Sequence, residues 1–184
     1  MIETVSIGEH SMSTEVKHLA EQLFQLLTAS RLKVVTAESC TAGLLARQLA
    51  DTPGAGECFH GGFVTYSKDH KSRALAVPAD LLRAKGAVCG EVARAMAEGA
   101  LQHSTADLSA AITGVAGPEP DEDGNPVGRV CIAVAQRGGP TRDFERHYPT
   151  RERGCIRRRA INDALNALIA AAGAHPEVAG PSEG

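Results

Sequence analysis

Aromatic residues are scarce in this chain of 184 residues, which has no tryptophan, two tyrosines and four phenylalanines. Proteins that bind single-stranded nucleic acid stack bases on aromatic side chains, so this composition excludes a stacking platform of that kind. Acidic residues outnumber basic ones, 22 to 19, which excludes a general electrostatic footprint for nucleic acid or anionic membranes. We therefore expect no direct nucleic-acid partner.

Paired cysteines and long apolar runs are also lacking. The five cysteines are odd in number and none forms a C-x-x-C pair, which argues against a disulfide framework or a structural zinc site. No run approaches the roughly 18 apolar residues of a membrane span, and residues 1–13 contain no apolar signal-peptide core. These absences predict a cytoplasmic protein without membrane contact.

Several ligand-binding motifs are missing as well. The chain has no G-x4-G-K-[ST] phosphate loop and no G-x-G-x-x-G after a predicted strand, so nucleotide-triphosphate and hydride-transfer chemistry are disfavoured. The acidic cluster in residues 119–123 lacks the register of a calcium-binding loop. We expect a solvated loop there, with no bound metal and no cofactor.

The chain length and a hydrophobic content of 43% suit one well-packed domain. We assign that domain to residues 14–172, after a flexible leader at 1–13 and before a disordered tail at 173–184. Apolar periodicity predicts alternating helices and short strands, which favours an α/β fold, a three-layer α/β/α sandwich around one mixed β-sheet. The helices are expected at 14–29, 41–50, 67–75, 79–84, 90–102 and 151–171, and the strands at 33–37, 63–66, 108–113, 130–135 and 141–148. Only residues 137–140 join the last two strands, which predicts a hairpin.

The segment A-E-S-C-T-A-G at 37–43 joins a buried strand to a helix. Such a junction offers unpaired backbone N–H groups and the positive end of a helix dipole, which can hold an oxyanion. It carries the polar side chains Glu38, Ser39, Cys40 and Thr41. The segment is therefore either a reaction site or a turn in which Ser and Thr serve as helix N-caps.

Tyr66 and Lys71 lie at the end of the next strand and in the first turn of the next helix. Open α/β sheets bind ligands beyond the carboxyl ends of their strands, where Ser39 is also expected. A desolvated Lys71 beside Tyr66 could take the proton from Ser39, which is the Ser–Lys form of nucleophile activation. The alternative is an ordinary solvated helix lysine.

Two further segments suit anion binding. Thr113 is followed by the glycine-rich stretch T-G-V-A-G-P, whose backbone can approach a ligand closely. A plain turn-rich loop is the alternative. Arg153 and Arg157 share one face of the last predicted helix, and guanidinium groups bind phosphates in a forked geometry. The net acidity of the chain makes a small phosphorylated ligand a better partner than nucleic acid.

Taken in order, these motifs resemble the CinA C-terminal domain family, whose stand-alone members are nicotinamide-nucleotide amidases. The resemblance covers about residues 14–170. It rests on A-E-S-C-T-A-G at 37–43, G-G-F-V-T-Y-S at 61–67 with Lys71, G-A-V at 86–88 with E-V-A at 91–93, T-G-V-A-G-P at 113–118, P-V-G at 126–128, and Arg153 with Arg157.

The resemblance implies a CinA-like fold, a homo-oligomer, and deamidation of nicotinamide mononucleotide to nicotinate mononucleotide and ammonia in pyridine-nucleotide salvage. The mononucleotide is then the small-molecule partner. In that reaction Ser39 would attack the amide, Lys71 would be its base, and Tyr66 would position or relay the proton. The expected oxyanion donors are the amides of Cys40, Thr41, Ala42 and Gly43. The expected substrate-binding residues are Thr113, Gly114, Ala116, Gly117, Arg153 and Arg157, with Glu38 grouped beside them as a structural or orienting residue.

Some positions depart from the family pattern. Ala42 replaces a usual glycine and is expected to be helical, Cys89 stands where serine is common, and Lys68 replaces a frequent asparagine. Lys68 adds positive charge beside Lys71, which would lower the pKa of Lys71 or displace it. Cys40 is a rival nucleophile, because a helix N-terminus lowers a thiol pKa.

Two other functions stay open: a non-catalytic partner protein related to competence or DNA damage, and a regulator that binds a phosphorylated metabolite.

Overall fold

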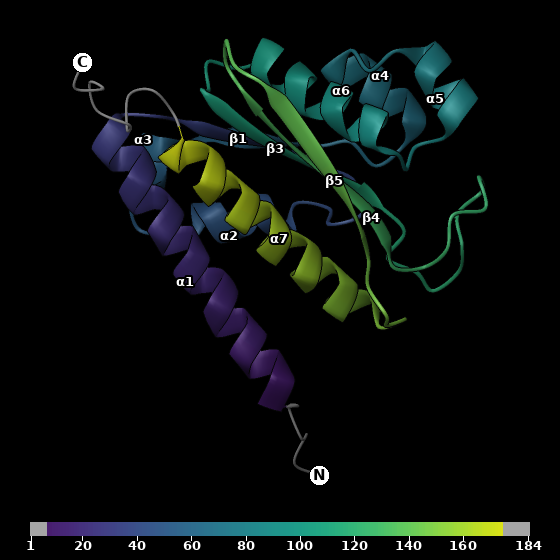
Figure 1. The fold of residues 1–184 in the computed structure, drawn as a ribbon, viewed down its shortest axis with the longest axis horizontal. Helices are drawn as coiled ribbons and strands as arrows, with labels where there is room; N and C mark the ends of the chain where they lie inside the picture. Colours follow the sequence, from purple (N-terminus) through teal and green to yellow (C-terminus); the bar gives the residue numbers. More distant parts are fainter. Residues whose placement is uncertain (1–6, 175–184) are drawn as a thin grey trace.

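The computed structural model describes residues 7–174, which form three layers with a sheet between two groups of helices (Figure 1). One face of the sheet is covered by α1 (Ile7–Ser30), α2 (Leu44–Ala50), α3 (Ala55–Cys58) and α7 (Arg153–Gly173). The other face is covered by α4 (Lys68–Leu75), α5 (Ala79–Lys85) and α6 (Gly90–Gln102). The predicted three-layer α/β/α sandwich is therefore confirmed.

The sheet has five strands in the order β2-β1-β3-β4-β5. The strands are β1 (Val34–Glu38), β2 (Phe59–Val64), β3 (Leu108–Gly114), β4 (Arg129–Gln136) and β5 (Thr141–His147). β1 pairs in parallel with both β2 and β3, whereas β4 is antiparallel to β3 and to β5. The mixed sheet and the closing hairpin are both as predicted, because parallel neighbours need a long crossover and the short 137–140 connection permits only a hairpin.

The central strands are buried on both faces, which is why their sequences are apolar without alternation. Each face has its own hydrophobic cluster. One joins α1, α2 and α7 to the sheet, and the other joins α4, α5 and α6 to it. Two cores on opposite sides therefore fix the position of the strand ends between them.

Several element boundaries differ from the sequence predictions. α1 begins at Ile7, so part of the predicted leader is helical, and α7 ends at Gly173. β2 begins at Phe59 and includes both glycines that were expected to precede it, and the short helix α3 was not predicted. The rest of the predicted leader and tail, residues 1–6 and 175–184, lies outside the described residues. None of the helices within residues 7–174 has the length and apolar character needed to cross a membrane.

Candidate active site

A cleft of about 630 Å³ lies at the carboxyl ends of β1, β2 and β3. Because these three strands are parallel, the segments that follow them meet at one edge of the sheet. The cleft is lined by residues 39–40 after β1, 66–69 after β2, 87–88 before α6, 113–117 at the end of β3 and just beyond it, 119 and 121–123 in the loop that follows, and Arg153 of α7. The predicted motifs thus converge on one cavity.

The segment after β1 is a tight turn and not the first turn of a helix. Ala42 and Gly43 have φ values of 52° and 89°, both left-handed, and α2 begins only at Leu44. The expectation that Ala42 is helical was therefore wrong. The turn is anchored to the sheet, since the amide of Ser39 donates to the carbonyl of Ile112 at 2.9 Å. Ser39 is consequently held at the end of β1, beside the central strand β3.

Glu38 lies beneath this turn with no exposed surface. Its carboxylate accepts hydrogen bonds from the amides of Gly43 at 3.0 Å, Leu45 at 3.1 Å and Ala46 at 2.7 Å. An acidic side chain at a helix start satisfies the free N–H groups and the helix dipole. Glu38 therefore caps α2, which is the structural role expected for it, and it does not line the cleft with the residues grouped beside it as substrate-binding.

This cap also corrects the predicted oxyanion hole. Gly43 donates its amide to Glu38, and Ala42 donates its amide to the carbonyl of Ser39 at 3.1 Å. These two groups are thus engaged within the turn. Of the four predicted donors, the amides of Cys40 and Thr41 are left as candidates for holding an oxyanion.

Ser39 and Lys71 form the central contact of the site. The Nζ atom of Lys71 lies 2.8 Å from the Oγ atom of Ser39. Lys71 has no exposed surface, and Ser39 is 7% exposed and opens on the cleft. The sequence left open whether Lys71 was a solvated helix lysine, and its burial excludes that alternative.

The surroundings of Lys71 make its proton easier to lose than that of a solvated lysine. Its Nζ atom donates to the carbonyls of Thr65 at 2.8 Å and Tyr66 at 3.4 Å, and within the described residues no carboxylate lies at ion-pair distance. Burial lowers the pKa of Lys71 to about 8, with a smaller lowering by the charge of Lys68. The three contacts match the three N–H donors of the ammonium group; after loss of one proton, two donors stay on the carbonyls and the lone pair faces the Oγ atom of Ser39.

Cys40, the rival nucleophile, is poorly suited to attack. Its side chain is 5% exposed, and burial raises its pKa to about 12. The thiolate is the reactive form of cysteine, so a thiol with this pKa is inert at neutral pH. The geometry therefore favours Ser39 over Cys40.

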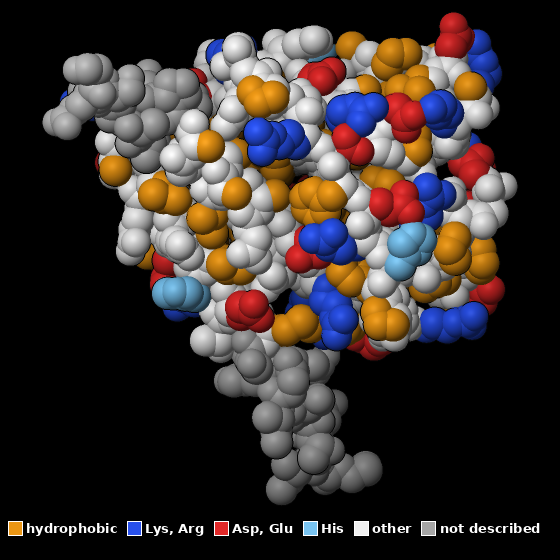
Figure 2. Space-filling model, in the orientation of Figure 1, with side chains coloured by type: hydrophobic (Ala, Val, Ile, Leu, Met, Phe, Trp, Pro, Cys, Tyr) orange, Lys and Arg blue, Asp and Glu red, His pale blue; other side chains and the backbone are white. Residues whose placement is uncertain are grey.

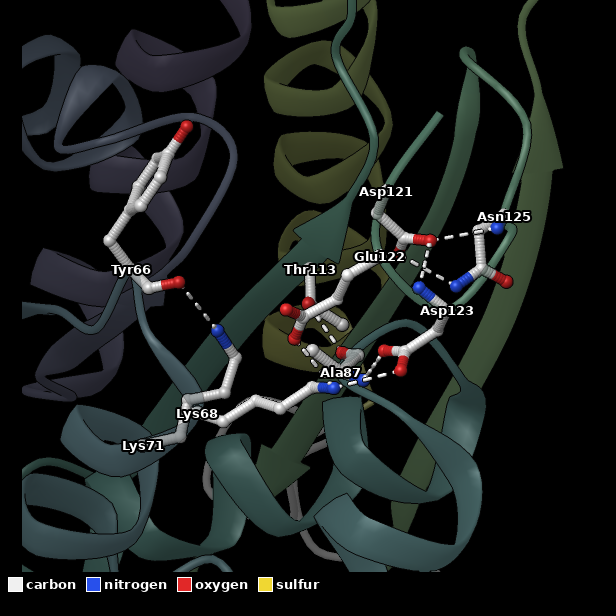
Figure 3. A network of polar contacts seen from close by, with 9 residues as sticks. All are labelled: Tyr66, Lys68, Lys71, Ala87, Thr113, Asp121, Glu122, Asp123 and Asn125. Atoms are coloured by element: carbon white, nitrogen blue, oxygen red, sulfur yellow. Dashed lines mark hydrogen bonds and ion pairs between the residues drawn. The ribbon is translucent and has the colours of Figure 1, made fainter. Parts of the chain in front are cut away.

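The main chain and the side chain of Tyr66 have different contacts. Its main-chain carbonyl contacts Lys71, while its ring points away from that lysine (Figure 3). The side chain is 61% exposed, and its hydroxyl lies 3.4 Å from Arg153. In this arrangement the phenol does not contact Lys71, and the ring forms part of the cleft mouth, so the predicted role of Tyr66 in positioning or relaying a proton stays a prediction.

The end of β3 and the loop after it line the cleft with Thr113, Gly114, Ala116 and Gly117, and their role in substrate binding stays a prediction. The hydroxyl of Thr113 is already used, because it donates to the carbonyl of Ala87 at 2.7 Å. Arg153 lies at the cleft and donates to the carbonyl of Gly117 at 2.6 Å. Arg153 is the predicted anion-binding side chain that reaches the cavity.

Arg157 has a structural contact instead. Its guanidinium group donates to the carbonyl of Thr41, which ties α7 to the turn after β1. Arg157 does not line the cleft, although its spacing from Arg153 had predicted a shared role in binding phosphate. Although one helical turn apart, the two arginines thus have different partners: Arg153 contacts Gly117 at the cleft, and Arg157 contacts the turn after β1.

Sequence reasoning missed a polar network on the far side of the cleft (Figure 3). Lys68 donates to Asp123 at 2.8 Å and pairs with Glu122 at the same distance. Asp123 also accepts the amide of Ala87 at 3.3 Å. The acidic loop is therefore docked on α4 and not simply solvated. In the sequence, the signals for this network were the extra lysine at position 68 and the surplus of acidic residues in the loop 119–123.

Within residues 7–174 no cluster of three or more His, Cys, Asp or Glu side chains could hold a metal.

Comparison with known proteins places this site in a family context. Residues 16–172 match the model of the CinA C-terminal domain. A CinA-like protein of Akkermansia muciniphila is 44% identical over 154 residues, which is 84% of this chain and 35% of that protein. The chain spans about a third of the length of the curated relatives it matches.

Solved structures agree with this match. A competence/damage inducible protein of Agrobacterium tumefaciens shares 38% identity and a TM-score of 0.82, covering 85% of this chain and 94% of that one. A CinA superfamily protein of Escherichia coli shares 34% identity and a TM-score of 0.81, with coverages of 92% and 94%. The chain therefore belongs to the CinA C-terminal domain family.

Proposed function

We propose that the protein is an amidohydrolase that converts nicotinamide mononucleotide to nicotinate mononucleotide and ammonia. The observation that carries this proposal is the buried Lys71 amine at 2.8 Å from the Ser39 hydroxyl, at the floor of a cleft. A serine paired with a desolvated lysine is an activated nucleophile for acyl transfer. The choice of nicotinamide mononucleotide as substrate rests on the resemblance to the CinA C-terminal domain family.

In the first half of the reaction, Oγ of Ser39 attacks the carboxamide carbon while Nζ of Lys71 takes the hydroxyl proton. The negative charge that develops on the carbonyl oxygen is held by the amides of Cys40 and Thr41. Lys71 then gives its proton to the departing nitrogen. Ammonia leaves, and an ester joins Ser39 to the nicotinoyl group.

In the second half, a water molecule attacks the ester carbon and Lys71 accepts its proton. Collapse of the tetrahedral intermediate breaks the bond to Oγ of Ser39, which recovers its proton from Lys71. The nicotinate product leaves as a carboxylate. Throughout, the carbonyls of Thr65 and Tyr66 hold the amine in line with Ser39.

Charge in the cleft favours one orientation of the substrate. Arg153 lines the cleft beside Gly117, and the acidic residues 119 and 121–123 line it as well. A guanidinium group binds phosphate well, so the phosphate belongs beside Arg153. The carboxamide then points to Ser39, and the cleft volume of about 630 Å³ is within the range of small-molecule sites.

The test is ammonia release from nicotinamide mononucleotide by the purified protein. Ser39→Ala should reduce the rate by at least about 1,000-fold, because nucleophile and base act as one unit. Cys40→Ala, the matched control at the neighbouring position, should keep activity within about threefold. Loss of activity in Cys40→Ala with retention in Ser39→Ala would transfer the nucleophile to Cys40. If the protein binds a pyridine nucleotide but does not hydrolyse it, the amidase proposal is wrong and a regulatory binding protein is favoured.

A further inference from the structure

Arg157 of α7 contacts the turn after β1 that carries Ser39, but the reaction described above gives it no role. Its guanidinium group donates to the main-chain carbonyl of Thr41. Helix α7 packs beside α2 and is held in the core by Ile156 and Ala160, which have no exposed surface (Figure 1). The base of the Arg157 side chain is therefore fixed relative to this turn.

The surroundings of Arg157 are unfavourable for a charged side chain. The residue is half-buried, its Nε atom is buried without a hydrogen-bond partner, and within residues 7–174 it forms no ion pair. By comparison, Arg129 and Arg146 each pair with a carboxylate. Burying a charge or a donor without a partner costs folding free energy. The position of Arg157 is thus better explained by a role in the site than by a gain in stability.

The carbonyl that Arg157 binds belongs to a strained turn. Thr41 accepts the amide of Leu44 at 3.2 Å. Between these two residues, Ala42 and Gly43 have φ values of 52° and 89°. Turns with two positive φ values favour glycine, asparagine or aspartate, because the Cβ atom of other residues approaches the following carbonyl oxygen. Without an outside contact, the peptide before Ala42 would rotate towards a conformation that suits alanine better.

Two hydrogen-bonded peptide groups lead from Arg157 to a candidate oxyanion donor. Arg157 binds the C=O of the peptide between Thr41 and Ala42, and the N–H of that peptide donates to the carbonyl of Ser39 at 3.1 Å. The Ser39 carbonyl shares a peptide plane with the amide of Cys40. Because peptide groups are planar, fixing the first group fixes the direction of the last N–H. Hydrogen bonds in such a chain also polarise one another, which strengthens the Cys40 amide as a donor.

We propose that Arg157 is a positioning residue for the reaction, which acts through the peptides of residues 39–42 and directs the Cys40 amide at the oxyanion. The proposal rests on the proposed function, since it requires acyl transfer at Ser39. Arg157 does not line the cleft, so it acts through the turn and not on the substrate. Its positive charge adds to the effect, because it favours the negative charge that develops on the carbonyl oxygen.

The first test separates kcat from KM for ammonia release from nicotinamide mononucleotide. Arg157→Met should lower kcat by about 30-fold, because a misdirected donor loses part of its stabilisation of the transition state. KM should stay within about threefold, since the substrate is bound by other residues. Arg157→Lys keeps a cationic donor and should return kcat to within about threefold of the wild type. Arg159→Met removes an exposed arginine from the same helix and is the matched control, with no change expected.

The second test determines whether Arg157 acts through the strained turn. Ala42→Gly removes the steric preference of residue 42 for right-handed backbone, so the turn keeps its shape with less help. In the Ala42→Gly background, Arg157→Met should lower kcat by about tenfold less than it does in the wild-type background. Equal losses in both backgrounds, or a rise in KM with kcat unchanged, would overturn the proposal, because Arg157 would then act independently of the turn or on the substrate.

A third measurement does not depend on the identity of the substrate. The boron atom of 3-pyridylboronic acid can bond to Oγ of Ser39 while the hydroxyl proton passes to Lys71, which gives a tetrahedral, negatively charged adduct like the oxyanion. The Kd of this adduct, measured by 11B NMR titration, should rise about tenfold in Arg157→Met and return in Arg157→Lys. An unchanged Kd in Arg157→Met would make Arg157 a structural contact only.

Urea denaturation checks that each variant is folded. If Arg157→Met is not, Arg157→Gln, which keeps a neutral donor, is put to the same measurements and should lose less than the full effect. The two proposals fail separately. Absence of ammonia release in the wild-type protein removes the amidase assignment, whereas a boronate Kd and a kcat that do not respond to Arg157 remove its positioning role.

Discussion

At the scale of single residues, the site depends on two buried ionisable side chains, Glu38 and Lys71, which have different roles. Glu38 is surrounded by amide donors and serves the structure, whereas Lys71 has only neutral partners and is available for chemistry. A carboxylate that accepts several N–H groups is stabilised in its charged form, while an amine among carbonyls without a counter-ion is not. The same degree of burial thus produces a helix cap in one case and a base in the other.

Replacing Glu38 by glutamine tests the cap. Glu38→Gln keeps the shape but directs an NH2 group at an amide donor, so at least one buried hydrogen bond is lost together with the charge. We expect a loss of about 2–3 kcal/mol in the free energy of unfolding, measured by urea denaturation. Glu57→Gln in the first turn of α3 is the control and should cost less than about 0.5 kcal/mol. Equal losses in both variants would contradict the capping role.

Residue types and their order sufficed to predict the Ser39–Lys71 pair, because both residues follow strands that end at one edge of the sheet. The directions of Glu38, Tyr66 and Arg157 could not be predicted. Each depends on a tertiary neighbour: the start of α2, the side chain of Arg153, and the carbonyl of Thr41. A sequence pattern indicates which face a residue occupies, but not the partner that its polar atoms find.

At the scale of elements, predictions succeeded where the hydrophobic period was long and clear. The bounds of α6 are those predicted, Gly90–Gln102, because its apolar stripe is continuous. The start of β2 was missed because its two glycines have low strand propensity. Their presence is explained by packing: a Cβ atom at Gly62 would lie 2.4 Å from Thr36 Oγ1 and 3.1 Å from the Cβ atom of Ala46. The glycine allows β2 to approach β1 and α2.

Gly62→Ala tests this explanation. The added methyl group must displace Thr36 of the buried strand β1, so we expect the variant to lose about 1–3 kcal/mol of stability in urea denaturation. Gly56→Ala in α3 is the matched control, because a Cβ atom there meets nothing within 4 Å and alanine favours helix. The control should be unchanged or slightly more stable. An unchanged Gly62→Ala variant would mean that the two strands separate without cost.

At the scale of the whole molecule, the fold buries the side chain of Lys71 near strand ends that lie between two hydrophobic cores, and burying this amine is unfavourable. The clusters on the two faces fix the ends of β1, β2 and β3, and the cleft lies where those ends meet. Outside the cleft, basic and acidic side chains are interspersed on the face shown in Figure 2. The mixed sheet was predictable from the alternation of elements, but the unfavourable burial of Lys71 was not, because it depends on how tightly α4 packs on α6.

This burial makes stability depend on pH in a defined window. Lys71 has a pKa of about 8 in the folded protein and its usual value of 10.5 when unfolded. Below pH 8 both states hold the proton, and folding carries the full penalty of burying the charge. Between pH 8 and 10.5 the unfolded state holds more protons than the folded state, so the contribution of Lys71 to stability rises with pH.

Comparison with Lys71→Met isolates this contribution, because every other titrating group is shared. The unfolding free energy of the wild type minus that of the variant should rise by about 3 kcal/mol between pH 7.5 and 11, measured by urea denaturation at each pH. Lys85→Met removes a half-exposed lysine paired with Glu91 and is the control. Its difference from the wild type should not rise with pH, because the pKa of Lys85 is raised and its ion pair weakens as the lysine loses its proton. A Lys71 difference that is flat with pH would show that the folded protein solvates this amine as well as water does, and a neutral base at Ser39 would then have no physical origin.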